Sequence, residues 1–311
     1  MKQLCLYLFL ILMTLCSKTF ATTEWETLNH ELETLYQRGD YAGATAVAKK
    51  ALRTAEQTLD ANHPDIATSL NSLALLYSDQ AQYDQAEPLL RRALSIFRNT
   101  VGEESPEVAA TLNNLAMVHR KQGQYAQAEP LYKRALAIDE KAHGPDHPNV
   151  AVSLNNLAQL YQAQEQYEQA EPLLKRALEI LEKTLGPGHP NVAMSLNNLA
   201  LLYNAQKQYA QAEPLYKRVI AISRKSLGPD HPNVALSLNN LAGLYKDQGK
   251  YPQAEPLFRR ALAISEKSLG RDHPNVATSL ENLAQLYRDI GHADKGEPLD
   301  KRAAAIRAAR N

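Results

Sequence analysis

The chain is poor in cysteine. Its 311 residues include two cysteines, Cys5 and Cys16, and both lie in an apolar N-terminal segment. If that segment is removed, the mature chain has no cysteine, which excludes disulfides, a catalytic thiolate and cysteine-bound metals. The sequence also lacks the glycine-rich phosphate-binding motifs, the H-E-x-x-H zinc motif and the G-x-S-x-G nucleophile motif. We therefore predict a protein that is not an enzyme and that has no cofactor and no metal.

An excess of charge of one sign is missing as well. The 34 basic and 34 acidic residues balance. A near-neutral chain offers no basic stripe for nucleic acid and no strong attraction to anionic membranes. The apolar run Leu4–Leu15 has about 12 residues, whereas a membrane-spanning helix needs roughly 20. We predict no nucleic-acid partner and no membrane span in the mature chain.

The apolar run is typical of a secretory signal peptide. It follows the basic residue Lys2, and the small residues Thr19 and Ala21 occupy the two positions that a signal peptidase reads. We predict a signal peptide over residues 1–21, cleaved near Ala21, and a secreted or periplasmic protein. Attachment of a lipid at Cys16 and an uncleaved anchor are the alternatives.

The dominant feature of the remaining sequence is a pattern that recurs every 42 residues. Such self-similarity predicts an array of structural repeats. After a degenerate helix pair at 22–62, we place six repeats at 63–104, 105–146, 147–188, 189–230, 231–272 and 273–311. The period is marked by residues that precede a proline, which are His63, Ser105, His147, His189, His231 and His273 in one series and Glu87, Glu129, Glu171, Glu213, Glu255 and Glu297 in the other.

Each repeat is predicted to contain two amphipathic helices, as the repeat at 147–188 shows. In its first half, Val150, Leu154 and Leu157 fall on one stripe of a helix, and the apolar residues within 170–181 do the same in its second half. Neither helix can bury its stripe alone, so neighbouring pairs must stack. We predict an all-α fold, a right-handed superhelical solenoid of antiparallel helix pairs.

The repeat resembles the tetratricopeptide repeat. Leu157-Ala158 followed by Tyr161 resembles that family's L-G-x-x-Y motif. The 42-residue length and the blocks NNLA-x-LY, AEPL-x-KRAL and LG-x-DHP are similar to the repeats of kinesin light chains and their bacterial relatives over residues 63–311. This resemblance implies a helical superhelix that binds peptide segments along its concave face. It does not imply a motor subunit, because the segment 22–62 lacks the sustained heptads of a coiled coil.

Two columns of asparagines form the predicted binding surface. On a helical wheel the first column points away from the apolar stripe, and in a tetratricopeptide superhelix that side would line the groove. An amide offers two donors and two lone pairs, so it can bind the N–H and the C=O of a peptide backbone together. The second column lies on the flank of the helix, where a hydrogen bond to an adjacent helix is the alternative. The first column is Asn71, Asn113, Asn155, Asn197 and Asn239, and the second is Asn114, Asn156, Asn198, Asn240 and Asn282.

Apolar residues interrupt the same predicted groove at Met117, Met194, Leu201 and Leu236. Exposed apolar groups often mark an interaction site, and methionine adapts to varied partners. We predict that apolar side chains of an extended or helical partner segment contact these four residues.

A basic column runs along the second helices at Arg134, Arg176, Arg218 and Arg260. One interpretation is contact with acidic residues of the partner, which the resemblance to light-chain repeats also suggests. The other is an ion pair with the recurring glutamates of the Glu129 type, or a solvated edge.

The histidines that precede proline are predicted to be helix N-caps and not metal ligands. Each belongs to a different repeat, and Ser105, a good N-cap and a poor metal ligand, takes the same position once. His119, which replaces a tyrosine of the other first helices, is predicted to lie in the core. The glutamates before proline lie one to a repeat, out of reach of a partner for acid–base catalysis.

Together these features predict a non-catalytic scaffold whose asparagine-lined groove holds a segment of a partner protein or peptide. The alternative function is structural, as a self-associating component of an envelope or secretion assembly.

Overall fold

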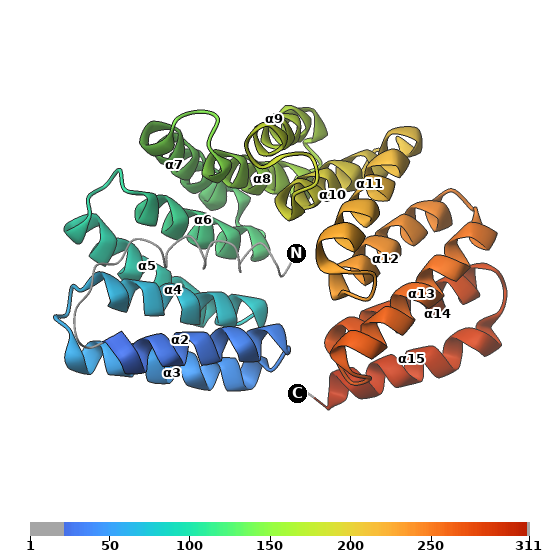
Figure 1. The fold of residues 1–311 in the computed structure, drawn as a ribbon, viewed down its shortest axis with the longest axis horizontal. Coiled ribbons are helices and arrows are strands. Elements are labelled where there is room, and N and C mark those ends of the chain that lie inside the picture. The colour runs from blue at the N-terminus through green and yellow to red at the C-terminus, as the bar shows by residue number, and fades with distance from the viewer. Residues whose placement is uncertain (1–21, 310–311) are drawn as a thin grey trace. The chain divides into compact units, whose positions relative to one another are not determined.

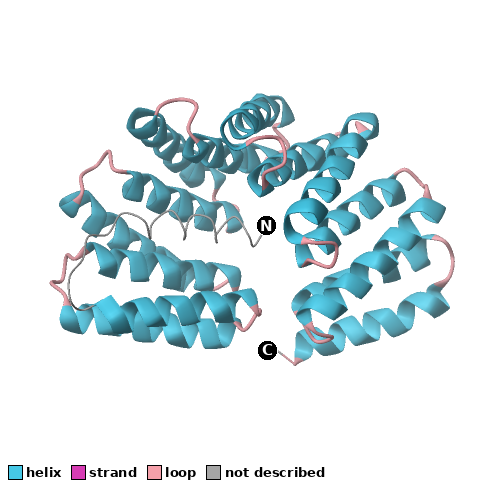
Figure 2. Cartoon of the chain, in the orientation of Figure 1, coloured by secondary structure: helices cyan, strands magenta, loops and turns pink. Residues whose placement is uncertain are grey.

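The structure is a computed structural model, and it describes residues 22–309 (Figures 1 and 2). That part of the chain forms fourteen α-helices joined by short loops, with no β-strand. The predicted signal peptide at 1–21 lies outside the described residues. The helices are α2 (Thr22–Gln37), α3 (Tyr41–Thr58), α4 (Pro64–Asp79), α5 (Tyr83–Thr100), α6 (Pro106–Lys121), α7 (Tyr125–His143), α8 (Pro148–Ala163), α9 (Tyr167–Leu185), α10 (Pro190–Ala205), α11 (Tyr209–Leu227), α12 (Pro232–Asp247), α13 (Tyr251–Leu269), α14 (Pro274–Asp289) and α15 (Ala293–Ala308).

The described helices fall into two compact units, α2–α8 up to Glu165 and α9–α15 from Gln166. In the first unit α2 packs on α3, α4 on α5 and α6 on α7, and each second helix also contacts the first helix of the next pair. The second unit has the same arrangement in the pairs α10–α11, α12–α13 and α14–α15. First helices of neighbouring pairs also touch, as α4 touches α6 and α12 touches α14. The predicted all-α array of antiparallel helix pairs is confirmed.

The two helices of a pair cross where both carry small residues. Ala212 in α11 and Ala254 in α13 are fully buried, and Gly296 takes the equivalent position in α15. A Cβ on Gly296 would lie 3.0 Å from the carbonyl oxygen of Ala284 in α14. The small residues of the repeat therefore allow the backbones to approach closely, and the larger apolar residues fill the space on either side.

Each first helix from α4 onward begins with proline, preceded by a side chain that caps the helix. In five helices that side chain is histidine, whose Nδ1 accepts the backbone N–H two residues later at 3.1 to 3.2 Å. In α6 the Oγ of Ser105 accepts the N–H of Val108 at 3.4 Å. A ring nitrogen that accepts a hydrogen bond must be unprotonated. The prediction that the histidine column caps helices is therefore confirmed, and the caps need neutral rings.

A recurring hydrogen bond ties the second helices α7, α9, α11 and α13 to the next first helix. Tyr161 Oη donates to Glu129 Oε1 at 3.1 Å, and Tyr245 Oη donates to Glu213 Oε1 at 2.9 Å. The same contact joins Tyr203 to Glu171 and Tyr287 to Glu255. Each glutamate also accepts from a basic residue one helical turn later, such as Lys217 for Glu213, and this bond holds the pKa of Glu213 below its ordinary value.

One carboxylate lies in the interior of the first unit. Asp139 of α7 is buried, and Oγ of Ser153 in α8 donates a hydrogen bond to its Oδ2 at 2.6 Å. Burial raises the pKa of Asp139 to about 7, although the bond from Ser153 opposes the shift. The equivalent positions of two later repeats hold Ser223 and Ser265, which are buried and neutral.

We expect the cap formed by His231 to make the protein less stable in mild acid. Burial lowers the pKa of His231, so the unfolded chain takes up a proton more readily than the folded chain. The stability due to this cap is complete above the unfolded pKa of about 6.5 and is lost as pH falls through the lower folded pKa. H231S should keep a cap, as Ser105 does, without titrating. Thermal unfolding at pH 7.5 and 5.5 should show a smaller acid loss for H231S than for the wild type, by about 1 kcal/mol. An identical loss in both proteins would contradict the role of the ring.

Asp139 should have the opposite effect on pH dependence. Because its folded pKa lies above its unfolded value of 3.8, the folded state binds the proton more tightly, and stability decreases as pH rises from about 4 through about 7. D139S, which copies the residue found in two other repeats, should be more stable than the wild type at pH 8 by up to about 4 kcal/mol. The difference should shrink towards pH 4 in urea unfolding experiments. S223D is the reciprocal variant and should lose stability at pH 8. Parallel pH profiles for D139S and the wild type would contradict the buried charge.

Candidate functional site

The first asparagine column joins the repeats to one another. Asn71 Nδ2 donates to Thr111 Oγ1 at 3.0 Å, and Asn113 Nδ2 donates to Ser153 Oγ at 2.8 Å. Asn71, Asn113 and Asn155 are each 3% exposed. The prediction that these three present free amides to a peptide is therefore wrong, because the side chains are enclosed by the helical packing and a buried amide is used by its neighbours.

The last two members of this column are less enclosed. Asn197 and Asn239 are half-buried, in α10 and α12 of the second unit. Asn239 Nδ2 still donates to Ser279 Oγ at 3.0 Å, as Asn71 and Asn113 do to their own hydroxyl partners. Asn155 instead donates to the carbonyl oxygen of Ala151 in its own helix at 2.8 Å. Asn197 Oδ1 accepts from Asn240 Nδ2 at 2.7 Å. The amides of Asn197 and Asn239 are therefore used in hydrogen bonds between neighbouring first helices, and binding a partner is not their main role.

The second asparagine column follows the same trend along the chain. Asn114, Asn156 and Asn198 are buried, whereas Asn240 and Asn282 are half-buried. The bond from Asn240 to Asn197 is the contact between adjacent helices that the alternative interpretation predicts. Partly accessible asparagines of both columns thus occur in the second unit.

Sequence inspection alone missed the hydroxyl residues that pair with the first column. They are Thr111, Ser153 and Ser279, each 40 residues after its asparagine. The sequence does contain a pattern that could have identified them, because serine or threonine recurs at this position with the 42-residue period. A hydroxyl column in register with an amide column indicates a bond between repeats.

Apolar side chains are exposed on the first helices of the second unit. Leu201 of α10 is 42% exposed and Leu236 of α12 is 48% exposed, and Met194 is half-buried. Gly243 lies two turns after Leu236 on the same side of α12, and a Cβ there would meet nothing within 4 Å among the described residues. We call Met194, Leu201, Leu236, Asn240 and Gly243 the first-helix patch.

The first-helix patch carries no formal charge. Helix α10 contains no charged residue, and the charged residues of α12 are the last two, Lys246 and Asp247. Both of these are paired at the ends of the helices, Asp247 with the Asn204 amide at 3.1 Å and Lys246 with Asp289 at 4.0 Å. The patch can therefore contact apolar side chains without leaving a charge unpaired.

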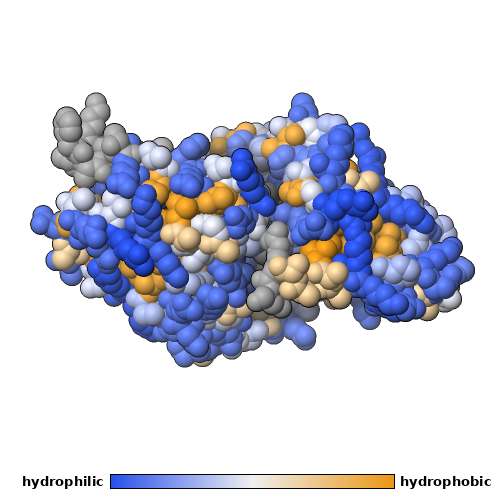
Figure 3. Space-filling model, turned by 90° about the horizontal axis from the view of Figure 1, so that it is seen from below, coloured by the Kyte–Doolittle hydropathy of each residue, from blue (hydrophilic) through white to orange (hydrophobic). Residues whose placement is uncertain are grey.

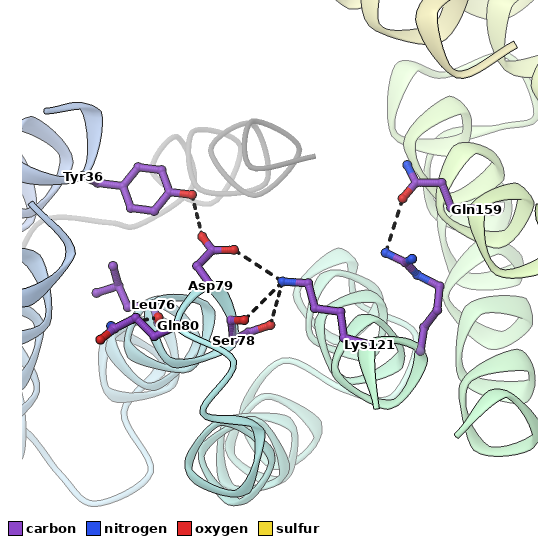
Figure 4. A network of polar contacts seen from close by, with 8 residues as sticks. Tyr36, Leu76, Ser78, Asp79, Gln80, Lys121 and Gln159 are labelled. Carbon is purple, nitrogen blue, oxygen red and sulfur yellow. Dashed lines mark hydrogen bonds and ion pairs between the residues drawn. The ribbon is translucent and has the colours of Figure 1, made fainter. Parts of the chain in front are cut away.

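The corresponding first helices of the first unit end in a charged network that sequence inspection missed (Figure 4). Tyr36 Oη donates to Asp79 Oδ2 at 2.6 Å, and Lys121 Nζ lies 3.4 Å from Asp79 Oδ1. Lys121 also donates to Oγ of Ser78 at 3.1 Å. Met117, the predicted contact residue of this unit, is half-buried in the same helix as Lys121. These contacts join α2, α4 and α6, so their charges serve packing.

The arginine column forms ion pairs, although not with the expected glutamates. Arg218 Nη2 lies 2.5 Å from Glu182 Oε1, and Arg134 pairs with Glu104. The glutamates of the Glu129 type instead pair with a basic residue one turn later, as described above. Arg176 also has an interaction partner, whereas Arg260 is exposed and has no ion pair within residues 22–309.

His119 lies in the core, as predicted. It is 2% exposed, and its Nδ1 lies 2.6 Å from Oε1 of Gln124. Within residues 22–309 the structure has no group of three or more His, Cys, Asp or Glu side chains that could hold a metal ion. No helix of this part is both long and apolar enough to cross a membrane.

Comparison with known proteins agrees with this architecture. The family model described as tetratricopeptide repeat matches residues 32–99, 107–183, 154–225, 191–267 and 234–309. A comparison with curated protein sequences gives no significant match.

Solved structures show the same fold. The chain is similar to a Podospora anserina putative kinesin light chain with nearly identical TPR-like repeats, at 32% identity over 66% of this chain and 98% of that chain, with a TM-score of 0.54. It is similar to BtubC (BKLC) from P. vanneervenii at 25% identity over 74% and 90% of the two chains, with a TM-score of 0.59. A Rap protein complexed with Competence and Sporulation Factor has a TM-score of 0.70 at 16% identity over 99% and 81%, which concerns the fold alone. With this fold and the family match along most of its length, the chain belongs to the tetratricopeptide repeat family.

Proposed function

We propose that the chain is a non-catalytic scaffold that binds a segment of a partner protein on the first-helix patch. The observation that carries this proposal is the exposure of Leu201 and Leu236 on an uncharged face of α10 and α12. Large apolar side chains in the middle of helices are normally covered in a stacked array, because the array is held together by such burial. Two of them left uncovered on adjacent helices fit a surface that a partner covers.

The proposed partner segment is extended and mainly apolar. Neighbouring first helices lie roughly 8–10 Å apart, and an extended chain advances about 3.3 Å per residue, so one repeat matches about three partner residues. Apolar partner side chains at that spacing would contact Leu201 and Leu236 in turn. The half-buried amides of Asn240 and Asn282 lie on the same series of helices and can bind the partner backbone.

On the face drawn in Figure 3, apolar side chains form small patches separated by polar ones. Broad self-association of envelope components normally uses larger continuous apolar areas. This face therefore favours capture of a narrow segment over the structural alternative. Light scattering of the mature protein separates the two, because self-association raises the measured mass.

The expected test compares L201S/L236S with the wild type. A peptide library is panned against the wild-type mature protein, and the selected peptide is measured by fluorescence polarisation. We expect the Kd of the double variant to be at least tenfold weaker, since about 1.4 kcal/mol of lost apolar contact gives that factor. Surface substitutions of this kind should leave the melting temperature within a few degrees.

V101S is the matched control for this test. Val101 is a large apolar residue 43% exposed in the other unit, so its substitution removes a similar exposed group away from the patch. We expect V101S to bind like the wild type. Equal binding by L201S/L236S and the wild type, failure to select any peptide, or a large loss of thermal stability in the double variant would each contradict the proposal.

We also propose that the scaffold works in a secreted or periplasmic location. The support is the sequence of residues 1–21, with Lys2, the apolar run and the small residues before position 22. Mass spectrometry of the full-length chain expressed in a Gram-negative host should find a mature N-terminus at Thr22. A retained Met1 would contradict the signal peptide, and a lipid on Cys16 would identify the anchored alternative.

A further inference from the structure

A recurring ion pair joins the second helices of successive repeats. Arg92 Nη1 lies 2.5 Å from Glu56 Oε1, and Arg218 Nη2 lies 2.5 Å from Glu182 Oε1. Arg302 pairs with Glu266 in the same way. In each case the glutamate precedes the arginine by 36 residues, so the contact has a fixed place in the repeat.

This ion pair is broken at Arg260. The residue 36 positions earlier is Arg224, so an arginine stands where Arg92, Arg218 and Arg302 each have a glutamate partner. Arg98 and Arg134 are also two arginines at this spacing, but each has a loop carboxylate, Glu103 and Glu104. Arg224 and Arg260 are both exposed, and neither has an ion pair or a side-chain hydrogen bond within the described part of the chain. Two like charges at a contact repel each other unless an anion lies between them or solvent separates them.

A second carboxylate is missing one repeat earlier, at the contact between α11 and the loop before α10. Lys267 pairs with Asp230 and Lys141 lies 3.5 Å from Glu104, each an acidic loop residue 37 positions before the lysine. For Lys225 that loop position is Gly188. Lys225 is exposed and also has no ion pair among residues 22–309. Two independent departures from the repeat thus leave Arg260 and Lys225 without the carboxylates that their equivalents contact, and Arg224 is the basic residue that replaces one of those carboxylates.

The helix dipole explains part of this cluster. Arg224 and Lys225 lie in the last turn of α11, where cations are favourable. Arg260, however, lies in the middle of α13, more than two turns before its end at Leu269, so the dipole does not account for it. The other second helices with a lysine at this place carry a Glu-Lys pair there, such as Glu266-Lys267, which satisfies the dipole and the ion pair together.

We propose that Arg224, Lys225 and Arg260 bind an acidic segment of a partner protein. Arginine pairs with carboxylates in a bidentate geometry, so two arginines at one junction can hold two acidic side chains. Leu227, 36% exposed at the end of α11, adds an apolar contact beside the cluster. This site lies on the second helices and does not depend on the first-helix patch.

The surroundings favour a protein segment over a polyanion. Charged groups close by in the sequence are already paired, Asp230 with Lys267 and Glu255 with Arg259, so carboxylates accompany the neighbouring cations on α13. A duplex or an anionic membrane needs an extended basic surface, which three cations do not provide.

The test uses a fluorescein-labelled twelve-residue peptide with four glutamates and two leucines, and the same peptide with glutamine at the four positions. We expect the wild type to bind the acidic peptide at least tenfold more tightly than the glutamine peptide in fluorescence polarisation. Binding should weaken as salt rises from 50 to 200 mM, because the cluster is exposed.

R224E and R53E separate a local site from net charge. R224E restores a carboxylate 36 residues before Arg260, so it should lose at least tenfold in affinity for the acidic peptide with an unchanged or higher melting temperature. Arg53 is exposed on α3 without an ion pair in residues 22–309, so R53E makes the same charge change elsewhere and should alter the affinity less than twofold. G188D should lose part of the affinity, and L201S/L236S none.

Three results would overturn the proposal. One is equal affinity of the wild type for the acidic and the glutamine peptide. Another is an equal loss in R53E and R224E, which would assign the effect to net charge. The third is tighter binding to single-stranded DNA or to phosphatidylserine vesicles than to the acidic peptide, which would assign the cluster to a different class of partner.

Discussion

The contact between one repeat and the next governs the rest of this structure, because no helix pair here can cover its own apolar stripe. Leu154 and Tyr216 are fully buried, and the small residues at the helix crossings set how closely the two helices of a pair approach. The polar contacts follow the same logic. Asn113 with Ser153 and Tyr245 with Glu213 both join one repeat to its neighbour. A residue that recurs in every repeat is therefore first of all a residue that holds repeats together.

This constraint separates packing from binding in the asparagine columns. An amide enclosed at 3% exposure and bonded to a hydroxyl of the next repeat is out of reach of a peptide, because the packed helices cover it. Repetition by itself carried no information about function, since duplication repeats every column. The informative positions are those where the period fails. Leu236 stands where the other first helices carry Thr68, Ala110, Val152, Met194 or Thr278, and Leu201 stands where they carry Leu75, Met117, Gln159, Gly243 or Gln285.

Much of the fold could be predicted from the sequence, and the limits have a physical cause. The start of α8 at Pro148 and the end of α9 at Gly186, with φ of 83°, follow from backbone chemistry that acts within a few residues. The helical wheel placed Asn155 opposite the apolar stripe of its own helix, which is correct for an isolated pair. A first helix in the array is flanked by other first helices, as α6 is by α4 and α8, and those neighbours cover positions that a single wheel counts as exposed.

Charged residues also differ between positions that follow the repeat, where they hold repeats together, and positions that depart from it, where they are available to a partner. Where a cation and a carboxylate recur together, as Arg218 and Glu182 do, each cancels the other and the surface stays neutral towards partners. Such a pair adds little to stability because it is exposed, so its loss in one repeat costs the fold little. A contact between repeats that has lost its carboxylates can therefore bind a new ligand without destabilising the array. Substitution at Asp139 is constrained more tightly, because its carboxylate is buried and its ionisation acts directly on the free energy of folding. The sequence of such an array can vary most freely at exposed positions where most repeats have an ion pair. Specificity for different partners can arise at these positions.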